Sequence, residues 1–563
     1  MTKSSEIPTR WWGWGDIDKT YPVEERPTYI PFLEEKLGIK VKEVRVPDPD
    51  IESVKLRNVR LKEATLKALA GVVGNKHVST SRHDRVYHGL GKSYRDLLRG
   101  HLEQVPNPPD AVLFPASEKE VKGILKIADK EAIAVVPFCG GSSVVGGVEP
   151  LNRKGLKGSI TVDLRRMDKV IHIDGESQTA TFEAGIWGPE LEEELMKQGL
   201  YLGHAPESFK FSGLGGWIAS RSAGRQSTGY GKIEEMVKSV RMVTPRGVID
   251  TLDVPASATG PDMDQIICGS EGTLGIITRA TVKVRPLPES YDYRGLLFRE
   301  FEGGVQAVRE MMQSGIVPET IRISDTEESA LAMIVRKPSS NAAKEMGTMA
   351  ALKVLDVLGY SFKRGSFAIL GCEGEEDETS ARMKSITAVC RKHGAVPLGK
   401  SAGNEWYHGR YDHPYLRDIM MGWGVMIDTL ETATTWDNIM NVYHTVGEAI
   451  REAIADYGSK SIVTCHLSHS YRTGSSLYFI FFGKQANRRF ATVRVPIRVG
   501  RRRHDAVARL SPRASRPAAE IPGRRRRPGG VGVARTLRFA ARRKRGAVAT
   551  AVGRRLRQQS HSR

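Results

Sequence analysis

The sequence predicts an α+β protein of two or three domains followed by a disordered basic tail. Three observations support this fold class. The chain has 563 residues, too many for a single hydrophobic core. After Glu289 the expected order of elements is strand, helix, strand, strand, helix, which is typical of an antiparallel sheet backed by helices. The excess positive charge is confined to the C-terminal end of the chain.

The formal net charge of +20 does not describe the folded part of the protein. Residues 488–563 contain 23 Arg and one Lys against one Asp and one Glu, a net charge of +22, so residues 1–487 carry −2. A near-neutral body gives no electrostatic reason to expect a nucleic-acid partner. Residues 488–563 show no apolar period and their like charges repel, so we expect them to be disordered.

Composition excludes several classes of protein. The hydrophobic content of 40% is ordinary for a soluble protein, and no apolar run reaches the roughly 18 residues that span a bilayer. The first 22 residues contain no apolar stretch typical of a secretory signal. The five cysteines form no CxxC pair, which favours a reducing compartment and argues against a structural zinc site. We therefore expect a cytoplasmic protein.

Residues 1–105 are expected to form a mostly helical N-terminal region, and residues 106–288 a separate domain. Ser117 and Glu120 form a capping box before a helical stripe that starts at Val121. A second helix is expected to begin at Pro189, where the missing N–H costs nothing. Strands are expected at 111–114, 132–138, 159–164, 169–173, 179–184, on both sides of a Pro-Arg-Gly turn at 245–247, and in the alternating run that ends near Pro286.

Residues 289–487 are expected to form a second domain, and residues 488–563 the tail. The expected strands of the second domain are 293–301, 320–325, 366–374 and 476–483. The expected helices are 303–315, 377–394 and 434–458.

Four Gly-, Ser- and Thr-rich stretches follow the ends of predicted elements: 137–143, 207–217, 220–224 and 269–275. Backbone N–H groups in such loops can point into one concavity and bind phosphate oxygens, and glycine lets the backbone approach the ligand. The alternative is that each loop is only a tight turn. No G-x-G-x-x-G follows a strand, so the sequence does not support a nicotinamide-binding Rossmann fold.

Longer stretches resemble a known family. "PFCGGSSVVGG", "HAPESFKFSGLGGWIASRSAG", "MVTPRGVIDT" and "GSEGTLGIITRATVKVRPLPE" resemble the PCMH-type FAD-binding domain of the vanillyl-alcohol-oxidase-type flavoproteins. With "RWWGWGD", "HDRVYHGLG", "TIRISD", "YLRDIM" and "SLYF", in the same order, the chain is similar to the alkyldihydroxyacetonephosphate synthase (alkylglycerone-phosphate synthase) family of ether-lipid enzymes. The resemblance covers about residues 10–487.

This resemblance implies a two-lobed FAD-binding domain and a second domain that caps the isoalloxazine ring. It implies noncovalent FAD and a reaction that exchanges the acyl chain of acyl-dihydroxyacetone phosphate for a fatty alcohol through a flavin adduct. The expected partners are a lipid-like phosphate substrate and a fatty alcohol. The residues that it assigns to the cofactor are Pro137, Phe138, Cys139, Gly140, Gly141, Ser142, Ser143, Glu207, Ser208, Phe209, Lys210, Phe211, Ser212, Gly213, Ser220, Arg221, Ser222, Ala223, Gly269, Ser270, Glu271, Gly272, Thr273, Leu274 and Gly275.

Three residues are assigned to the reaction by the same resemblance. Tyr478 aligns with the catalytic tyrosine of the family, and a phenol can carry a proton when its neighbours tune its pKa. Arg417 and Arg322 align with important arginines, and each could form a fork with a substrate phosphate. The alternatives are a core aromatic for Tyr478 and surface ion pairs with Asp418 and Asp325 for the arginines.

Two histidines and one glycine bear on the site. His466 and His469 lie near Tyr478 in sequence, but we find no third ligand and predict no metal. Gly213 stands where some members of the family carry a threonine next to the flavin.

The family also continues beyond the "SLYF" strand with helices and a run of histidines, whereas this chain has no His-His and an Arg-rich tail. We hypothesise that residues from about Arg488 onward are a different reading frame of the same gene, because out-of-frame GC-rich DNA yields this composition. The alternative is a genuine tail that binds nucleic acid or anionic lipid. If the frame is broken, the chain as written is expected to be unstable or inactive.

Two other functions stay open at this stage. An FAD-linked oxidoreductase that oxidises a hydroxy acid or an alcohol would share the fold and the cofactor. A nucleic-acid-binding protein would act through residues 488–563 and bind in a strongly salt-dependent way. No specific nucleic acid is expected for the body of the chain, and contact with a membrane surface and a homodimer are left open.

Overall fold

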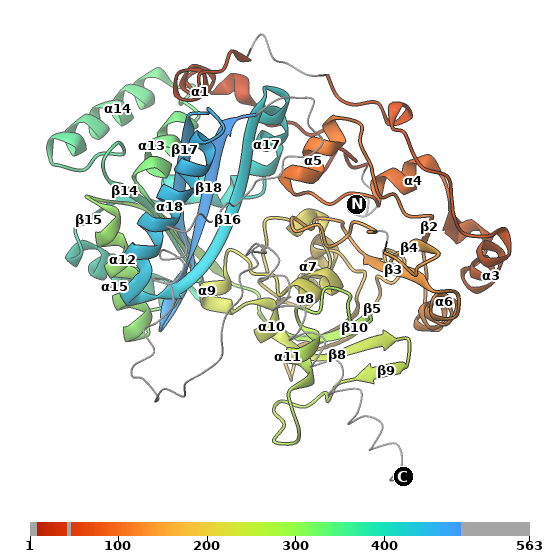
Figure 1. Cartoon of the computed structure of the whole chain (residues 1–563). Coiled ribbons are helices and arrows are strands. Elements are labelled where there is room, and N and C mark those ends of the chain that lie inside the picture. Colours follow the sequence, from red (N-terminus) through yellow and green to blue (C-terminus); the bar gives the residue numbers. More distant parts are fainter. Residues whose placement is uncertain (1–7, 42–46, 152, 486–563) are drawn as a thin grey trace, which may run out of the picture. The chain divides into compact units, whose positions relative to one another are not determined.

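The structure is a computed structural model that describes residues 8–41, 47–151 and 153–485 (Figure 1). Contacts group the described residues into one compact unit. The predicted disordered tail, residues 488–563, lies outside the described residues. Among the described helices, none combines the length and the apolar character needed to cross a bilayer.

The first lobe of the predicted FAD-binding domain is a four-stranded sheet. Strands β2, β4 and β3 are parallel, and β1 pairs antiparallel with β2. The strands are, in spatial order, β1 (Val78–Ser79), β2 (Ala111–Leu113), β4 (Gly158–Asp163) and β3 (Ile133–Phe138). Helix α6 (Glu118–Glu131) connects β2 to β3, and Ser117 Oγ accepts a hydrogen bond from the Glu120 N–H at 3.3 Å, as the capping box predicts.

The second lobe is a five-stranded antiparallel sheet. Its strands are, in spatial order, β5 (Val170–Asp174), β6 (Thr179–Glu183), β10 (Ile276–Lys283), β8 (Val237–Thr244) and β9 (Gly247–Asp250). Helices α7 (Gly188–Met196), α8 (Leu214–Ser220) and α11 (Met263–Ile267) belong to this lobe. Ile160 of the first lobe and Phe182 of the second lie in one continuous hydrophobic core, which explains why the two sheets act as one body.

The predicted cap is a seven-stranded antiparallel sheet, which confirms the α+β fold class. Its strands are, in spatial order, β15 (Ala395–Gly399), β12 (Ser290–Phe298), β14 (Ser366–Gly374), β13 (Thr320–Ser324), β17 (Ser461–Tyr471), β18 (Gly474–Lys484) and β16 (Val425–Thr435). Helices α12 (Phe301–Ser314), α15 (Glu376–Lys392) and α18 (Ile439–Ala455) pack on this sheet, as Figure 1 shows. Strands β15, β16 and β17 were not predicted.

Helices that the sequence pattern did not indicate connect the strands of the cap. They are α13 (Thr326–Ile334), α14 (Ala342–Val357), α16 (Lys400–Gly409) and α17 (His413–Gly422). Neither α14 nor α17 has a single apolar stripe, because α14 buries no residue and α17 buries six of its ten residues.

The N-terminal residues pack partly on the cap and partly on the first lobe. Their helices are α1 (Tyr29–Leu37), α3 (Glu63–Val73), α4 (Arg82–Tyr87) and α5 (Tyr94–His101). Tyr29 shares a hydrophobic cluster with Met420 of α17 and Phe482 of β18, whereas Leu69 of α3 lies in the core of the first lobe. The N-terminal segment thus spans from one part of the fold to the other.

Candidate functional site

The structure brings the first two Gly- and Ser-rich loops into direct backbone contact. A Cβ atom on Gly140 would overlap the carbonyl oxygen of Phe211, so only glycine allows this approach. A Cβ atom on Gly213 would lie 2.5 Å from the Cys139 sulfur. The loops 137–143 and 207–217 therefore interlock at two points, which fixes their separation.

The other two loops join the same assembly. The backbone N–H groups of Gly269 and Glu271 donate to the carbonyls of Ile218 and Ala219 at the end of α8, each at 2.9 Å. Gly272 has a φ of +73° and would place a Cβ atom 2.9 Å from the Pro137 ring. The structure thus gathers all four loops around the start of α8 and the end of β3.

This assembly fits a phosphate-bearing cofactor. The hydroxyl oxygen of Ser270 is buried and has no hydrogen-bond partner within residues 8–41, 47–151 and 153–485, so it is available to a ligand. A small pocket beside the 137–143 loop is lined by Gly140, Ser142, Lys92 and residues of the N-terminal segment. Burial lowers the pKa of Lys92 to about 8, so an anion placed nearby would favour its charged form.

Several residues assigned to the cofactor direct their side chains elsewhere. Arg221 donates to the Cys268 and Gln265 carbonyls at 3.0 and 2.8 Å and so braces the 269–275 loop. Glu207 forms an ion pair with Arg225 on the side that faces the cap. Lys210 lies near the ring of Tyr411, which belongs to the cap. The backbones of these positions and the ammonium group of Lys210 remain candidates for cofactor contact.

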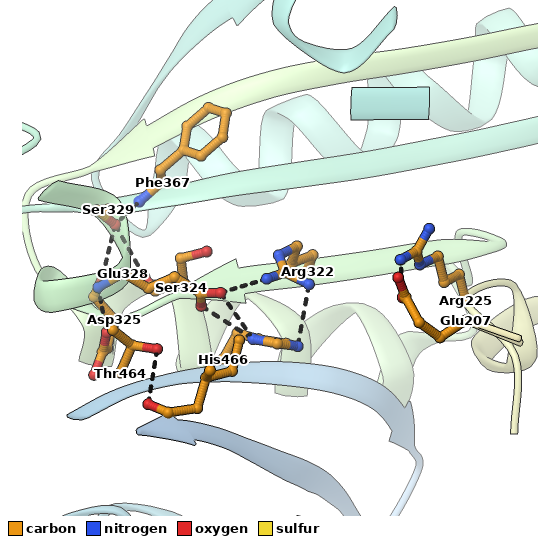
Figure 2. A network of polar contacts seen from close by, with 11 residues as sticks. Glu207, Arg225, Arg322, Ser324, Asp325, Glu328, Ser329, Phe367, Thr464 and His466 are labelled. Carbon is orange, nitrogen blue, oxygen red and sulfur yellow. Dashed lines mark hydrogen bonds and ion pairs between the residues drawn. The ribbon is translucent and has the colours of Figure 1, made fainter. Parts of the chain in front are cut away.

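On the cap, two of the three predicted site residues, Arg322 and Tyr478, lie on one face of the sheet with His466. Figure 2 shows Arg322 and His466. His466 of β17 is paired directly with Tyr478 of β18 and with Ser324 of β13. Because side chains alternate along a strand, Arg322 of β13 projects on the same side as Ser324. The Tyr478 ring stacks on the His466 ring with centroids 5.1 Å apart.

A buried carboxylate joins Arg322 to His466. Glu328 of α13 pairs with Arg322 and accepts from Nδ1 of His466 at 3.0 Å, while Arg322 lies 3.2 Å from Nε2 of the same ring. Burial alone would raise the pKa of Glu328, but Arg322 and His466 outweigh it and hold the pKa at about 2. The alternative of an Arg322–Asp325 pair is therefore wrong, because Asp325 accepts from the Glu328 N–H as the cap of α13.

Arg417 keeps free hydrogen-bonding capacity. Its Nε atom is buried and has no hydrogen-bond partner among the residues that the structure describes. The alternative of an ion pair with Asp418 is also wrong, because no such pair forms and Asp418 instead accepts from the Trp14 N–H at 2.5 Å. An arginine held without a carboxylate partner is suited to an anionic ligand.

The two halves of the site meet around Tyr478. Burial raises the pKa of Tyr478, the negative charge of Glu207 raises it further, and Arg417 lowers it. His413 begins α17 one turn before Arg417, and both lie on one helix face. Burial lowers the pKa of His413 to about 4, with smaller effects from Glu207 and Arg225. The loop residue Glu207 therefore lies close to groups of the cap.

Sequence reasoning missed His413, Glu328 and the role of His466. The i, i+4 spacing of His413 and Arg417 in "HPYLRD" was a visible signal for the first. Within residues 8–41, 47–151 and 153–485, no group of three or more His, Cys, Asp or Glu side chains could hold a metal ion. His466 and His469 are instead paired with separate carboxylates, Glu328 and Glu431.

Comparisons with known proteins agree with this arrangement. Residues 109–253 match the family model of the FAD binding domain, and residues 287–494 match that of the C-terminal domain of FAD linked oxidases. FAD is therefore the cofactor that the four loops would hold.

Curated relatives and a solved structure extend the match to most of the chain. An alkyldihydroxyacetonephosphate synthase of Trypanosoma brucei brucei is 34% identical over 496 residues, which cover 85% of this chain and 81% of that protein. The same enzyme of Dictyostelium discoideum is 38% identical over 71% of this chain, and the match spans 65% of its length. A solved alkyldihydroxyacetonephosphate synthase is 31% identical with a TM-score of 0.78, covering 89% of this chain and 93% of that one.

The contact between Gly140 and Phe211 predicts a sharp effect of one methyl group on cofactor binding. Gly140→Ala should lower the flavin-to-protein ratio of the purified protein at least tenfold, because the Cβ atom would separate loops 137–143 and 207–217. Gly71→Ala is the matched control in α3, outside the four loops, where the new methyl group meets no atom within 4 Å. Full flavin content in Gly140→Ala would show that this contact does not shape the cofactor site.

Proposed function

Because this chain belongs to the alkyldihydroxyacetonephosphate synthase family, we propose that it exchanges the acyl chain of acyl-dihydroxyacetone phosphate for a fatty alcohol, with FAD as its cofactor. One observation carries the proposal. The phenol of Tyr478 lies where the cap faces the cofactor loops, within the electrostatic influence of both Arg417 and Glu207. This supports the proposal that Tyr478 carries the proton and Arg417 binds the substrate phosphate in one site.

Noncovalent FAD, held by the backbones of the four loops, would supply the reactive nitrogen at which the chains are exchanged. The interlocked glycines let these backbones approach the cofactor closely. The loop 137–143 contains no histidine that could form a covalent link. Acid precipitation is therefore expected to release the flavin from the protein.

Tyr478 is proposed as the proton carrier. Its raised pKa keeps the phenol protonated near neutral pH, so it begins the reaction as a donor. Burial lowers the pKa of His466, and this neutral ring holds the phenol in place by stacking. Arg322 and Glu328 in turn hold His466, so the phenol rests on a connected set of buried groups.

The decisive experiment supplies the FAD-loaded full-length protein with acyl-dihydroxyacetone phosphate and a fatty alcohol. We expect the alkyl product to form without lasting bleaching of the flavin. Anaerobic bleaching by a hydroxy acid or an alcohol, with no exchange, would favour the FAD-linked oxidoreductase. Turnover by the full-length chain would also overturn the hypothesis that residues from about Arg488 onward are out of frame.

Removal of the Tyr478 hydroxyl should separate catalysis from cofactor binding. Tyr478→Phe should lower the exchange rate by about 10²-fold or more, the usual contribution of a positioned proton carrier, and leave the flavin spectrum unchanged. Tyr471→Phe removes a hydroxyl from the neighbouring strand β17 and should retain the wild-type rate. Normal exchange by Tyr478→Phe would exclude this residue as the proton carrier.

Arg417→Ala should weaken the productive binding of the phosphate substrate. Loss of a charge-assisted hydrogen bond costs about 1.5–3 kcal/mol, so we expect KM to rise by one to two orders of magnitude. Arg417→Lys keeps the charge but loses the planar fork and should show a smaller effect. An unchanged KM in Arg417→Ala would place the phosphate elsewhere.

We also propose that the protein contacts a membrane surface through α14, because its substrates are lipid-like. None of the 16 residues of this helix is buried. Its exposed apolar side chains recur at helical spacing and include Met346, Met349, Val354 and Val357. A helix without a buried face gains little stability from packing on its own protein. We therefore interpret its exposed apolar side chains as a surface for interaction with lipid.

Vesicle binding tests this surface. The full-length protein should co-sediment with neutral phosphatidylcholine vesicles, on which residues 488–563 gain no electrostatic attraction. Met346→Gln with Val357→Gln should abolish most of this binding. Leu252→Gln, which replaces a side chain of similar exposure in the FAD-binding part, should not. Equal co-sedimentation of all three proteins would rule out α14 as the contact.

A further inference from the structure

Tyr411 lies between α16 and α17 with three cationic side chains around its ring. The guanidinium carbon of Arg410 is 4.7 Å and that of Arg225 5.6 Å from the ring centroid, and the ammonium of Lys210 is 5.8 Å from it. The three cations come from separate segments: the end of the cap helix α16, the residues after the 220–224 loop, and the 207–217 loop. We call Tyr411 with these three residues the Tyr411 cluster.

The carboxylates near the Tyr411 cluster leave two of its cations unneutralised. Arg225 forms an ion pair with Glu207, and the nearby Asp412 pairs with Lys19 at 2.5 Å. Among the residues that the structure describes, no ion pair forms with Lys210 or Arg410. Burial lowers the pKa of Lys210, and the positive charges of Lys19 and Arg410 lower it further, beyond the opposing effect of Asp412.

The donors of the cluster also have unused capacity. Nη1 of Arg225 is buried and has no hydrogen-bond partner in the part of the chain that the structure describes. One terminal nitrogen of Arg410 donates to the Tyr407 carbonyl, while its plane stacks over the Tyr407 ring at 3.7 Å. Stacking orients a guanidinium fork at little entropic cost, and an arginine held in this way is suited to bidentate contact with phosphate.

We propose that Lys210, Arg225 and Arg410 form a second anion subsite that takes a phosphate monoester, separate from Arg417 and Arg322. An excess of two positive charges on an aromatic base matches the dianionic charge and the oxygen donors of such a group. The choice of a phosphate monoester as ligand rests on the proposed function, since acyl-dihydroxyacetone phosphate carries one. FAD also carries phosphate, so the test must separate the two sources.

The position of the Tyr411 cluster gives the subsite a role. His413 follows Tyr411 by two residues and begins α17, which carries Arg417 one turn later. The charges of Arg225 and of Arg322 both act on His413, and Figure 2 shows the Glu207–Arg225 pair in the same view as Arg322. A phosphate held at the Tyr411 cluster would therefore be next to the groups around Tyr478.

The test measures binding of inorganic phosphate to the FAD-loaded full-length protein by calorimetry at fixed ionic strength. The Arg417→Ala background removes one of the two other candidate phosphate ligands, and Arg322 and residues 488–563 are the same in every variant. Adding Lys210→Gln and Arg410→Gln should weaken phosphate binding at least tenfold. Lys67→Gln removes an exposed charge on α3, paired with Glu63, and should change nothing.

Three further measurements keep the outcomes distinct. Arg410→Lys should restore part of the phosphate affinity, because it returns the charge without the fork. Lys210→Gln alone changes an exposed side chain, and its phosphate affinity replaces that of the double variant if the double variant does not load flavin. Titration of the apoprotein of each variant with FAD measures the affinity for the cofactor. If the variants lose FAD affinity and keep phosphate affinity, the cluster binds the cofactor and the proposal is overturned.

Unchanged phosphate binding in the double variant would overturn the proposal as well. The phosphate-binding measurement does not depend on turnover. Absence of acyl exchange would therefore count against the proposed function, and the phosphate affinities would still test the second subsite. Conversely, exchange activity of the wild-type protein together with an unchanged phosphate affinity of the double variant would support the proposed function and exclude the second subsite.

Discussion

The close approach of Gly140 to the Phe211 carbonyl is the constraint on which the rest of the site depends. It sets the distance between loops 137–143 and 207–217. A second close contact, between Gly213 of the 207–217 loop and the sulfur of Cys139 in the 137–143 loop, sets the same distance. The Phe211 ring meets Trp14 of the N-terminal segment edge-on, with centroids 6.1 Å apart. One backbone contact thus positions the cofactor loops and the segment that covers them.

The same segment connects the cofactor loops to the cap. The Trp14 N–H donates to Asp418 of α17, next to Arg417, at 2.5 Å. Asp418 is buried, and burial raises the pKa of its carboxyl group, so this hydrogen bond offsets part of the cost of burying a charge. Asp418 accepts from the N-terminal segment and forms no ion pair with Arg417, although the charge of Arg417 still lowers the pKa of its carboxyl group. The Trp14–Asp418 hydrogen bond joins residues 404 apart in sequence, so only the tertiary structure decides this arrangement.

The cap sheet shows how one strand can serve both packing and chemistry. Phe479 and Leu477 of β18 are fully buried on the helix-covered face, while Tyr478 between them is only half-buried. The period of two along a strand makes this division unavoidable. Glu328 supplies the negative charge that pairs with Arg322, and it accepts a hydrogen bond from the neutral His466 ring, since a buried carboxylate without partners could not stay ionised in that position.

The sequence by itself determined the fold class, the four cofactor loops, and Tyr478, Arg417 and Arg322 as candidates, because glycine patterns and strand alternation are local properties and the resemblance is carried by short stretches. It did not determine the partners of those residues. The Arg322–Glu328–His466 set, the Asp418–Trp14 contact and the cations around Tyr411 join segments far apart in the chain. Only packing decides which side chains share a small volume of low dielectric constant, and electrostatic energies depend on that distance and burial rather than on sequence separation.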